Sequence, residues 1–173
     1  MKKTITVALT ALVFCSISTA NAESYKNTVS VGYAHTAVSG FLSGNAPGIN
    51  LKYHWEDLDS GLGIIASTSY NEMDITNIDG GKVKLGTFLL GPSYRFNEYF
   101  TLYAMAGAAK AKYESSIADD DQSKFTYGLG FQVNPANNWA IDASYQYAQF
   151  DTAYDSHPHV DTGTWVLGVG YSF

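Results

Sequence analysis

Apolar and polar side chains alternate along most of this chain with a period of two residues. The pattern is clearest at the C-terminus, where Trp165, Leu167, Val169, Tyr171 and Phe173 alternate with residues that are mostly small or polar. Successive side chains of a β-strand point to opposite faces, so a period of two is typical of a strand. Residues 160–173 are therefore predicted to form a strand with one face that requires an apolar environment.

The same alternation recurs in further segments, which predicts an all-β chain with eight strands in total. These segments are residues 29–33, 49–55, 62–70, 88–96, 99–113, 125–133 and 139–147. In residues 99–113 the many alanines leave open which residues share a face. The chain has 13 tyrosines, 9 phenylalanines and 16 glycines against 4 prolines, and this composition also favours β-structure.

The predicted connections alternate between short and long. Turn-forming residues occupy the short ones, at residues 57–60, 97–98 and 134–137. The long ones are polar and cover approximately residues 39–47, 74–83, 114–124 and 151–161. Strands connected in this way form an antiparallel up-and-down meander.

The first 22 residues have the features of a cleaved signal peptide. Lys2 and Lys3 precede an apolar run at residues 5–17, and Ala20-Asn21-Ala22 is a small-residue cleavage site. The apolar run is shorter than the roughly 20 residues that a spanning helix needs. Cleavage leaves residues 23–173 as the mature domain and removes Cys15, the only cysteine, so no disulfide is expected.

The two faces of the predicted strands favour a membrane barrel over a soluble one. The ionisable residues Lys52, His54, Glu56, Arg95 and Asp142 share their face with small residues, while the other face is aromatic and aliphatic. Small residues and paired charges suit a narrow barrel interior, and large apolar side chains suit contact with lipid. We therefore predict an eight-stranded antiparallel up-and-down transmembrane β-barrel in the bacterial outer membrane, a monomer in contact with lipid and lipopolysaccharide.

An eight-stranded barrel is only wide enough for side chains to fill its interior. Unpaired charge is costly in such an interior, so the five ionisable residues are expected to form a pairing network. The network is expected to close the barrel, and a channel is the less favoured interpretation.

Four segments resemble the strand motifs of the Ail/Lom/OmpX family. They are residues 48–56 (GINLKYHWE), 91–99 (GPSYRFNEY), 127–135 (YGLGFQVNP) and 163–173 (GTWVLGVGYSF). The resemblance implies an outer-membrane barrel whose four surface loops mediate attachment to host cells, entry into them, or resistance to complement in serum. It also implies that the barrel-assembly machinery reads the terminal strand, through Trp165, Leu167, Val169, Tyr171 and Phe173.

The expected loops combine apolar residues with an excess of acidic ones. The candidate partner-binding residues are Phe41, Leu42, Ile75, Ile78, Asp79, Lys82, Ile117, Asp119, Asp120, Asp121, Tyr154 and His157. Acidic loops disfavour heparin-like polyanions and nucleic acid, and the formal net charge of -6 points the same way. The expected partner is a host surface, matrix or complement-regulatory protein, with divalent cations bridging the loops to lipopolysaccharide.

The sequence lacks the common motifs for catalysis and metal binding. The chain has no Gly-x-Ser-x-Gly, no His-Glu-x-x-His and no phosphate-binding loop, so no enzyme activity, cofactor or metal is expected. A lipid A-modifying barrel remains an alternative, with Asp155, Ser156, His157 and His159 as its only candidate residues. A third possibility is a barrel that mainly maintains the envelope.

Overall fold

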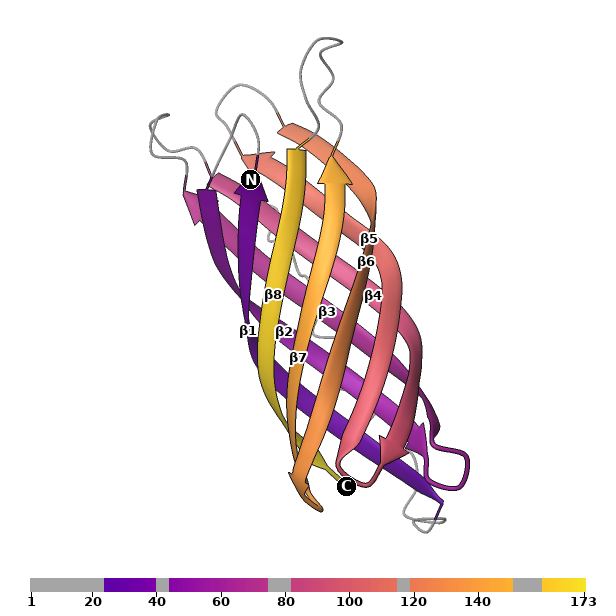
Figure 1. Ribbon diagram of the computed structural model, residues 1–173. Helices are drawn as coiled ribbons and strands as arrows, with labels where there is room; N and C mark the ends of the chain where they lie inside the picture. The colour runs from indigo at the N-terminus through magenta and orange to yellow at the C-terminus, as the bar shows by residue number, and fades with distance from the viewer. Residues whose placement is uncertain (1–23, 40–43, 75–81, 115–118, 151–159) are drawn as a thin grey trace, which may run out of the picture.

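The computed structural model describes residues 24–39, 44–74, 82–114, 119–150 and 160–173. Within these residues the chain forms eight strands, and each strand pairs antiparallel with its neighbours in sequence (Figure 1). The strands are β1 (Tyr25–Ser39), β2 (Gly44–Asp57), β3 (Leu62–Asp74), β4 (Lys82–Asn97), β5 (Phe100–Glu114), β6 (Asp119–Ala136), β7 (Trp139–Phe150) and β8 (Val160–Ser172). No helix among the described residues is long and apolar enough to cross a membrane.

The first and last strands close the sheet into a barrel, as the sequence predicts. In the β1–β8 register Val29 lies opposite Tyr171 and Tyr33 lies opposite Leu167. At the end of this ladder the backbone groups of Asn27 and Phe173 exchange two hydrogen bonds, of 3.0 and 2.9 Å. Closure leaves no strand edge unpaired, which hydrocarbon surroundings require because no water is present to bond a free N–H or C=O.

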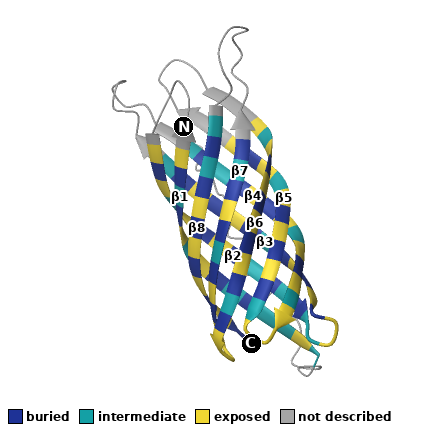
Figure 2. Cartoon of the chain, in the orientation of Figure 1, coloured by how far each residue is buried: buried dark blue, intermediate teal, exposed yellow. Residues whose placement is uncertain are grey.

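Burial alternates along the strands with the predicted period (Figure 2). On β2, Lys52, His54 and Glu56 are buried inside the barrel, whereas Ile49 and Leu51 are exposed on its outer wall. The outer wall of β8 carries the exposed side chains of Trp165, Leu167, Val169, Tyr171 and Phe173. The predicted assignment of the two faces is confirmed.

The strands extend farther than the alternating pattern does. The sequence predicts long connections at about 39–47 and 114–124, but β2 already begins at Gly44 and β6 at Asp119. These two strands therefore extend into the ranges predicted for the loops, because backbone hydrogen bonds continue a ladder whether or not the side chains alternate. The strands have 12 to 18 residues, more than the roughly 9–11 that cross a bilayer, so the sheet continues beyond the hydrocarbon.

The short turns lie at the same end of the barrel as the C-terminus (Figure 1). In the turn after β2, the Ser60 hydroxyl donates a hydrogen bond of 2.7 Å to the Asp57 carboxylate. Gly61 closes this turn with φ = 70°, a conformation that side chains disfavour. Short turns face the periplasm in outer-membrane barrels, so the opposite end is the extracellular one.

Candidate functional site

The interior of the barrel holds the ionisable residues that the sequence places on its inner face. Lys52, His54, Glu56 and Asp142 are each 2% exposed, while Arg95 is partly exposed towards the periplasmic end. Three of them lie on β2 at alternate positions, because residues two apart on a strand point to the same side. Arg95 projects from β4 and Asp142 from β7.

Lys52 binds Asp142 in the middle of the barrel. The Lys52 ammonium donates hydrogen bonds to the Asp142 carboxylate, to the Tyr103 hydroxyl at 3.0 Å and to the Ser144 hydroxyl at 3.0 Å. It also lies 5.5 Å from the centre of the Tyr103 ring. An ammonium group has three N–H donors, so these three acceptors satisfy all of them.

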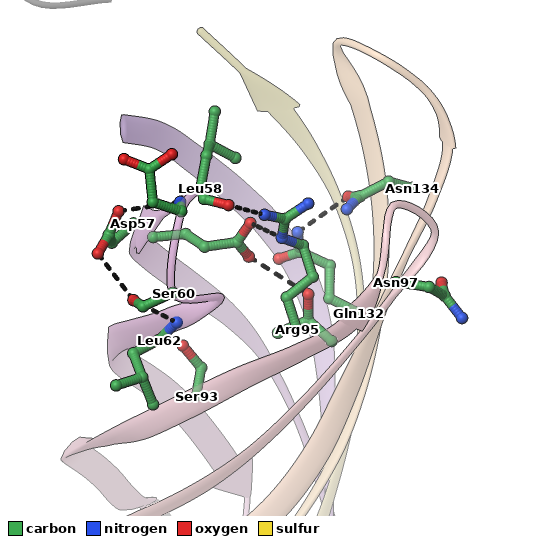
Figure 3. A network of polar contacts seen from close by, with 12 residues as sticks. Asp57, Leu58, Ser60, Leu62, Ser93, Arg95, Asn97, Gln132 and Asn134 are labelled. Carbon is green, nitrogen blue, oxygen red and sulfur yellow. Dashed lines mark hydrogen bonds and ion pairs between the residues drawn. The ribbon is translucent and has the colours of Figure 1, made fainter. Parts of the chain in front are cut away.

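Glu56 binds Arg95 nearer the periplasmic end, where Arg95 also contacts Leu58 of the β2–β3 turn (Figure 3). Arg95 Nε lies 2.8 Å from Glu56 Oε1, and Arg95 Nη2 donates a hydrogen bond of 2.6 Å to the backbone oxygen of Leu58. Thr101 donates a hydrogen bond of 3.3 Å to the other oxygen of Glu56. Arg95 therefore links the β2–β3 turn to strand β4.

His54 belongs to the same region but has a different main partner. Its Nε2 lies 2.7 Å from the Ser93 hydroxyl and 3.9 Å from Glu56 Oε2. The structure thus brings the five predicted residues together as two ion pairs, with His54 beside the second pair.

An apolar cluster inside the barrel was missed by the sequence reasoning. Ile65, Leu89, Tyr103 and Met105 pack together in the interior, each no more than 3% exposed. The two positions that interrupt the alternating pattern, at the adjacent pairs Ile64–Ile65 and Leu89–Leu90, mark where this cluster forms. The Lys52–Asp142 pair and these bulky apolar side chains together fill the section of the interior that they occupy.

The candidate partner-binding residues of the loops lie mostly beyond the part of the chain that the structure describes. Phe41, Leu42, Ile75, Ile78, Asp79, Ile117, Tyr154 and His157 all fall outside the described residues. Lys82 and Asp119 to Asp121 belong to described strands, and the backbone register places Asp121 opposite Lys112. These residues are adjacent to the connections at the extracellular end.

A metal centre finds no support in the described residues, which contain no group of three or more His, Cys, Asp or Glu side chains able to hold an ion. The candidate residues of the enzyme alternative, Asp155, Ser156, His157 and His159, fall outside the described residues.

Comparison with known proteins gives consistent matches over the length of the chain. Residues 7–173 match the family model described as outer membrane protein beta-barrel domain. The chain is 37% identical over 188 residues to the attachment invasion locus protein of Yersinia enterocolitica, with 100% of both chains covered. It is 33% identical over 183 residues to outer membrane protein X of Enterobacter cloacae, again with 100% of both chains covered.

The fold also matches a solved structure of the same type. It resembles the crystal structure of Ail, the attachment invasion locus protein of Yersinia pestis, in complex with the heparin analogue sucrose octasulfate. The TM-score is 0.70 at 35% sequence identity, and the match covers 87% of this chain and 99% of that chain.

Proposed function

Because the chain belongs to the outer-membrane β-barrel family that includes the attachment invasion locus protein and outer membrane protein X, we propose that its extracellular loops mediate attachment to host cells, entry into them, or resistance to complement. The chain is an outer-membrane protein, so these loops are the part of it that a host molecule can reach.

The filled interior is the observation that carries this proposal. The Lys52–Asp142 pair and the cluster around Met105 occupy the inside of the barrel, and the outer wall is apolar. A wall immersed in lipid and an interior packed with side chains leave the two ends for recognition. The extracellular end carries the longer connections.

The proposed partner is a protein on the host surface, in the matrix or among complement regulators. The loops offer apolar residues beside acidic ones, a mixture that protein interfaces use around a few buried anchors. The Yersinia pestis relative is seen with a heparin analogue. The acidic residues here disfavour a polyanion, because polyanion binding depends on Lys and Arg.

Three further parts of the proposal concern the membrane. The folded chain acts as a monomer in lipid, divalent cations bridge its acidic loops to lipopolysaccharide, and the barrel-assembly machinery reads the terminal strand ending in Phe173. The alternating apolar wall of that strand supports the role in assembly.

The lipid A-modifying alternative is not favoured, because the relatives are named for attachment or as outer membrane proteins.

The test expresses the chain in a non-adherent, serum-sensitive strain and measures adhesion to cultured cells and survival in serum. The intact chain is expected to raise at least one of the two, and a variant with all four loops shortened is expected to lose the gain. Because β-hairpin turns of two residues suffice to connect antiparallel strands, the shortened barrel can still close.

The control for this test is the amount of folded protein in the outer membrane, compared by mobility of unheated and heated samples on a denaturing gel. A barrel-interior variant with unchanged loops, Tyr103→Phe, should behave as the intact chain does. Equal adhesion and serum survival with intact and shortened loops would remove the attachment and serum-resistance proposal and favour a barrel that mainly maintains the envelope.

Adding heparin to the adhesion assay distinguishes a protein partner from a polyanionic one, since competition by heparin would contradict a protein partner.

A further inference from the structure

A cavity of about 450 Å³ opens at the periplasmic end of the barrel, away from the loops to which the proposed function refers. It lies between the short turns and the C-terminus, and its lining includes Lys26, Arg95, Glu98, Asn134 and Phe173. Cavities of 300–1,000 Å³ are typical of sites for small molecules. The polar groups on this lining decide which molecule fits.

Lys26 supplies a positive charge that the Glu56 carboxylate attracts through space but that no described residue binds at hydrogen-bond distance. It occupies the same face of β1 as the buried Thr28 and Ser30, and it is half-buried at the mouth. In the β1–β2 register it lies opposite Glu56, but the Glu56 carboxylate is bound by Arg95 and Thr101. The Lys26 ammonium forms no hydrogen bond or ion pair with any other described residue.

Asn134 supplies a buried N–H donor that also has no partner. Its side chain is 3% exposed, and its Oδ1 accepts a hydrogen bond of 2.9 Å from Gln132 Nε2 (Figure 3). Its Nδ2 is buried without a hydrogen-bond partner among the described residues. Leaving such a donor unsatisfied costs about 1–3 kcal/mol, so an acceptor in the cavity would bind favourably.

Arg95 and Glu98 complete the polar lining. Arg95 reaches the cavity with its guanidinium group, whose remaining N–H donors are not used by Glu56 and Leu58. Glu98 is exposed in the β4–β5 turn and contributes a carboxylate to the same cavity. The lining therefore presents N–H donors for an anionic group and a carboxylate for a cationic one.

We propose that this cavity binds a small zwitterion, a molecule of amino-acid or dipeptide size that carries one carboxylate and one ammonium group. The ligand carboxylate accepts hydrogen bonds from Lys26, Asn134 and Arg95, and the ligand ammonium binds Glu98. A simple anion is disfavoured, because Glu56 and Glu98 balance the two cations of the lining. The mouth faces the periplasm, so the ligand is a periplasmic solute or the free end of a periplasmic peptide.

The experiment uses the full mature barrel, folded in detergent micelles, with alanylalanine as the probe. Binding is followed by NMR through the side-chain amide of Asn134, in parallel with titrations of propionate, ethylammonium and inorganic phosphate. The dipeptide is expected to produce a saturable shift and to bind at least about tenfold more tightly than the three single-charge probes, since hydrogen bonds to charged groups contribute about 1.5–3 kcal/mol each.

Two variants separate the two ends of the ligand. Lys26→Gln is expected to weaken the dipeptide and propionate by about tenfold, and Lys26→Arg is expected to restore binding in part. Glu98→Gln, at an exposed turn position, is expected to weaken binding of the dipeptide and to leave propionate binding unchanged or somewhat tighter, because it removes a negative charge from the lining. Lys110→Gln is the matched control, because it removes one positive charge from the outer face of β5 and should change nothing.

Several results would overturn the proposal. The absence of a saturable shift with the dipeptide would do so, as would binding of propionate or phosphate as tight as that of the dipeptide. Equal affinity of the parent and Lys26→Gln, in a variant that retains the dispersed spectrum of the barrel, would also overturn it. None of these results bears on attachment, which depends on the other end of the barrel.

Discussion

Lys52 and Asp142 form an ion pair inside the barrel although 90 residues separate them in the sequence. Their strands, β2 and β7, are not hydrogen-bonded to each other, and both side chains are 2% exposed. The pair therefore connects two separate parts of the wall through a region that water reaches poorly. Removing either partner leaves a buried charge without compensation.

The first prediction concerns this ion pair. Asp142→Leu is expected to lower the free energy of unfolding by about 3–5 kcal/mol, because the Lys52 ammonium then stays buried without its counter-ion. The double variant Lys52→Met/Asp142→Leu removes both charges and is expected to cost less than the single one. Urea unfolding of the barrel in lipid vesicles measures both values. A loss for the double variant equal to the sum of the losses for Asp142→Leu and Lys52→Met alone would contradict a direct pair.

The second prediction tests the orientation of β5. Met105 points into the barrel and is 3% exposed, whereas Leu102 faces outwards and is 46% exposed. Met105→Ala is expected to cost about 2–5 kcal/mol, because it leaves a cavity among Ile65, Leu89 and Tyr103. Leu102→Ala should cost clearly less, since mobile lipid chains occupy the space. The same unfolding assay compares the two variants. A larger loss of stability from Leu102→Ala than from Met105→Ala would show that the two faces of β5 are exchanged.

The third prediction concerns the contact between β4 and β5. A Cβ atom added at Gly91 would overlap the backbone oxygen of Ala104, which cannot move without disturbing the ladder. Gly91→Ala is therefore expected to destabilise the barrel by about 1–3 kcal/mol. Gly86→Ala, on the same strand, is the matched control, because nothing lies within 4 Å of its added Cβ. The control should be neutral or stabilise by up to about 1 kcal/mol. Similar effects of the two substitutions would contradict the close approach at Gly91.

The fourth prediction tests the lipid-facing wall. Leu167 is 65% exposed in the middle of β8, and Leu62 is 57% exposed at the first position of β3, beside a periplasmic turn. Leu167→Arg is expected to cost about 2–4 kcal/mol, because the charge enters the middle of the bilayer. Leu62→Arg is expected to cost about 0–1 kcal/mol near the interface. Unfolding in vesicles should show this difference between the two variants. The difference should be smaller in short-chain detergent micelles, because they lack a bilayer midplane.

The fifth prediction concerns conduction. The interior contains two ion pairs and a cluster of bulky apolar side chains, so the folded barrel is expected to pass no steady ionic current in planar bilayers. A single-channel conductance that rises with salt concentration would contradict this. Such a current should then be larger in Met105→Ala, and a current that this variant leaves unchanged would point to leakage around the barrel.

Much of the architecture follows from local pattern. The alternation at Ile49, Leu51 and the buried Lys52 assigns the two faces of β2 without knowledge of any other strand. Likewise, the apolar wall at the C-terminus was predicted and is confirmed, and its strand pairs with residues 29–33, as closure of the predicted barrel requires. The signal peptide and the contrast between the two faces added the outer membrane, and the family motifs added the class of function, which alternation alone does not specify.

The sequence by itself determined the number of strands, the inner and outer faces of most of them, and the lipid-facing wall ending in Phe173, because the side-chain direction on a strand depends only on position along it. The tertiary structure decided the orientation of Met105, the apolar cluster in the interior, and that Lys52 binds Asp142 while Glu56 binds Arg95. Contacts across a barrel depend on the tilt and stagger of its strands, and these arise only when the sheet closes.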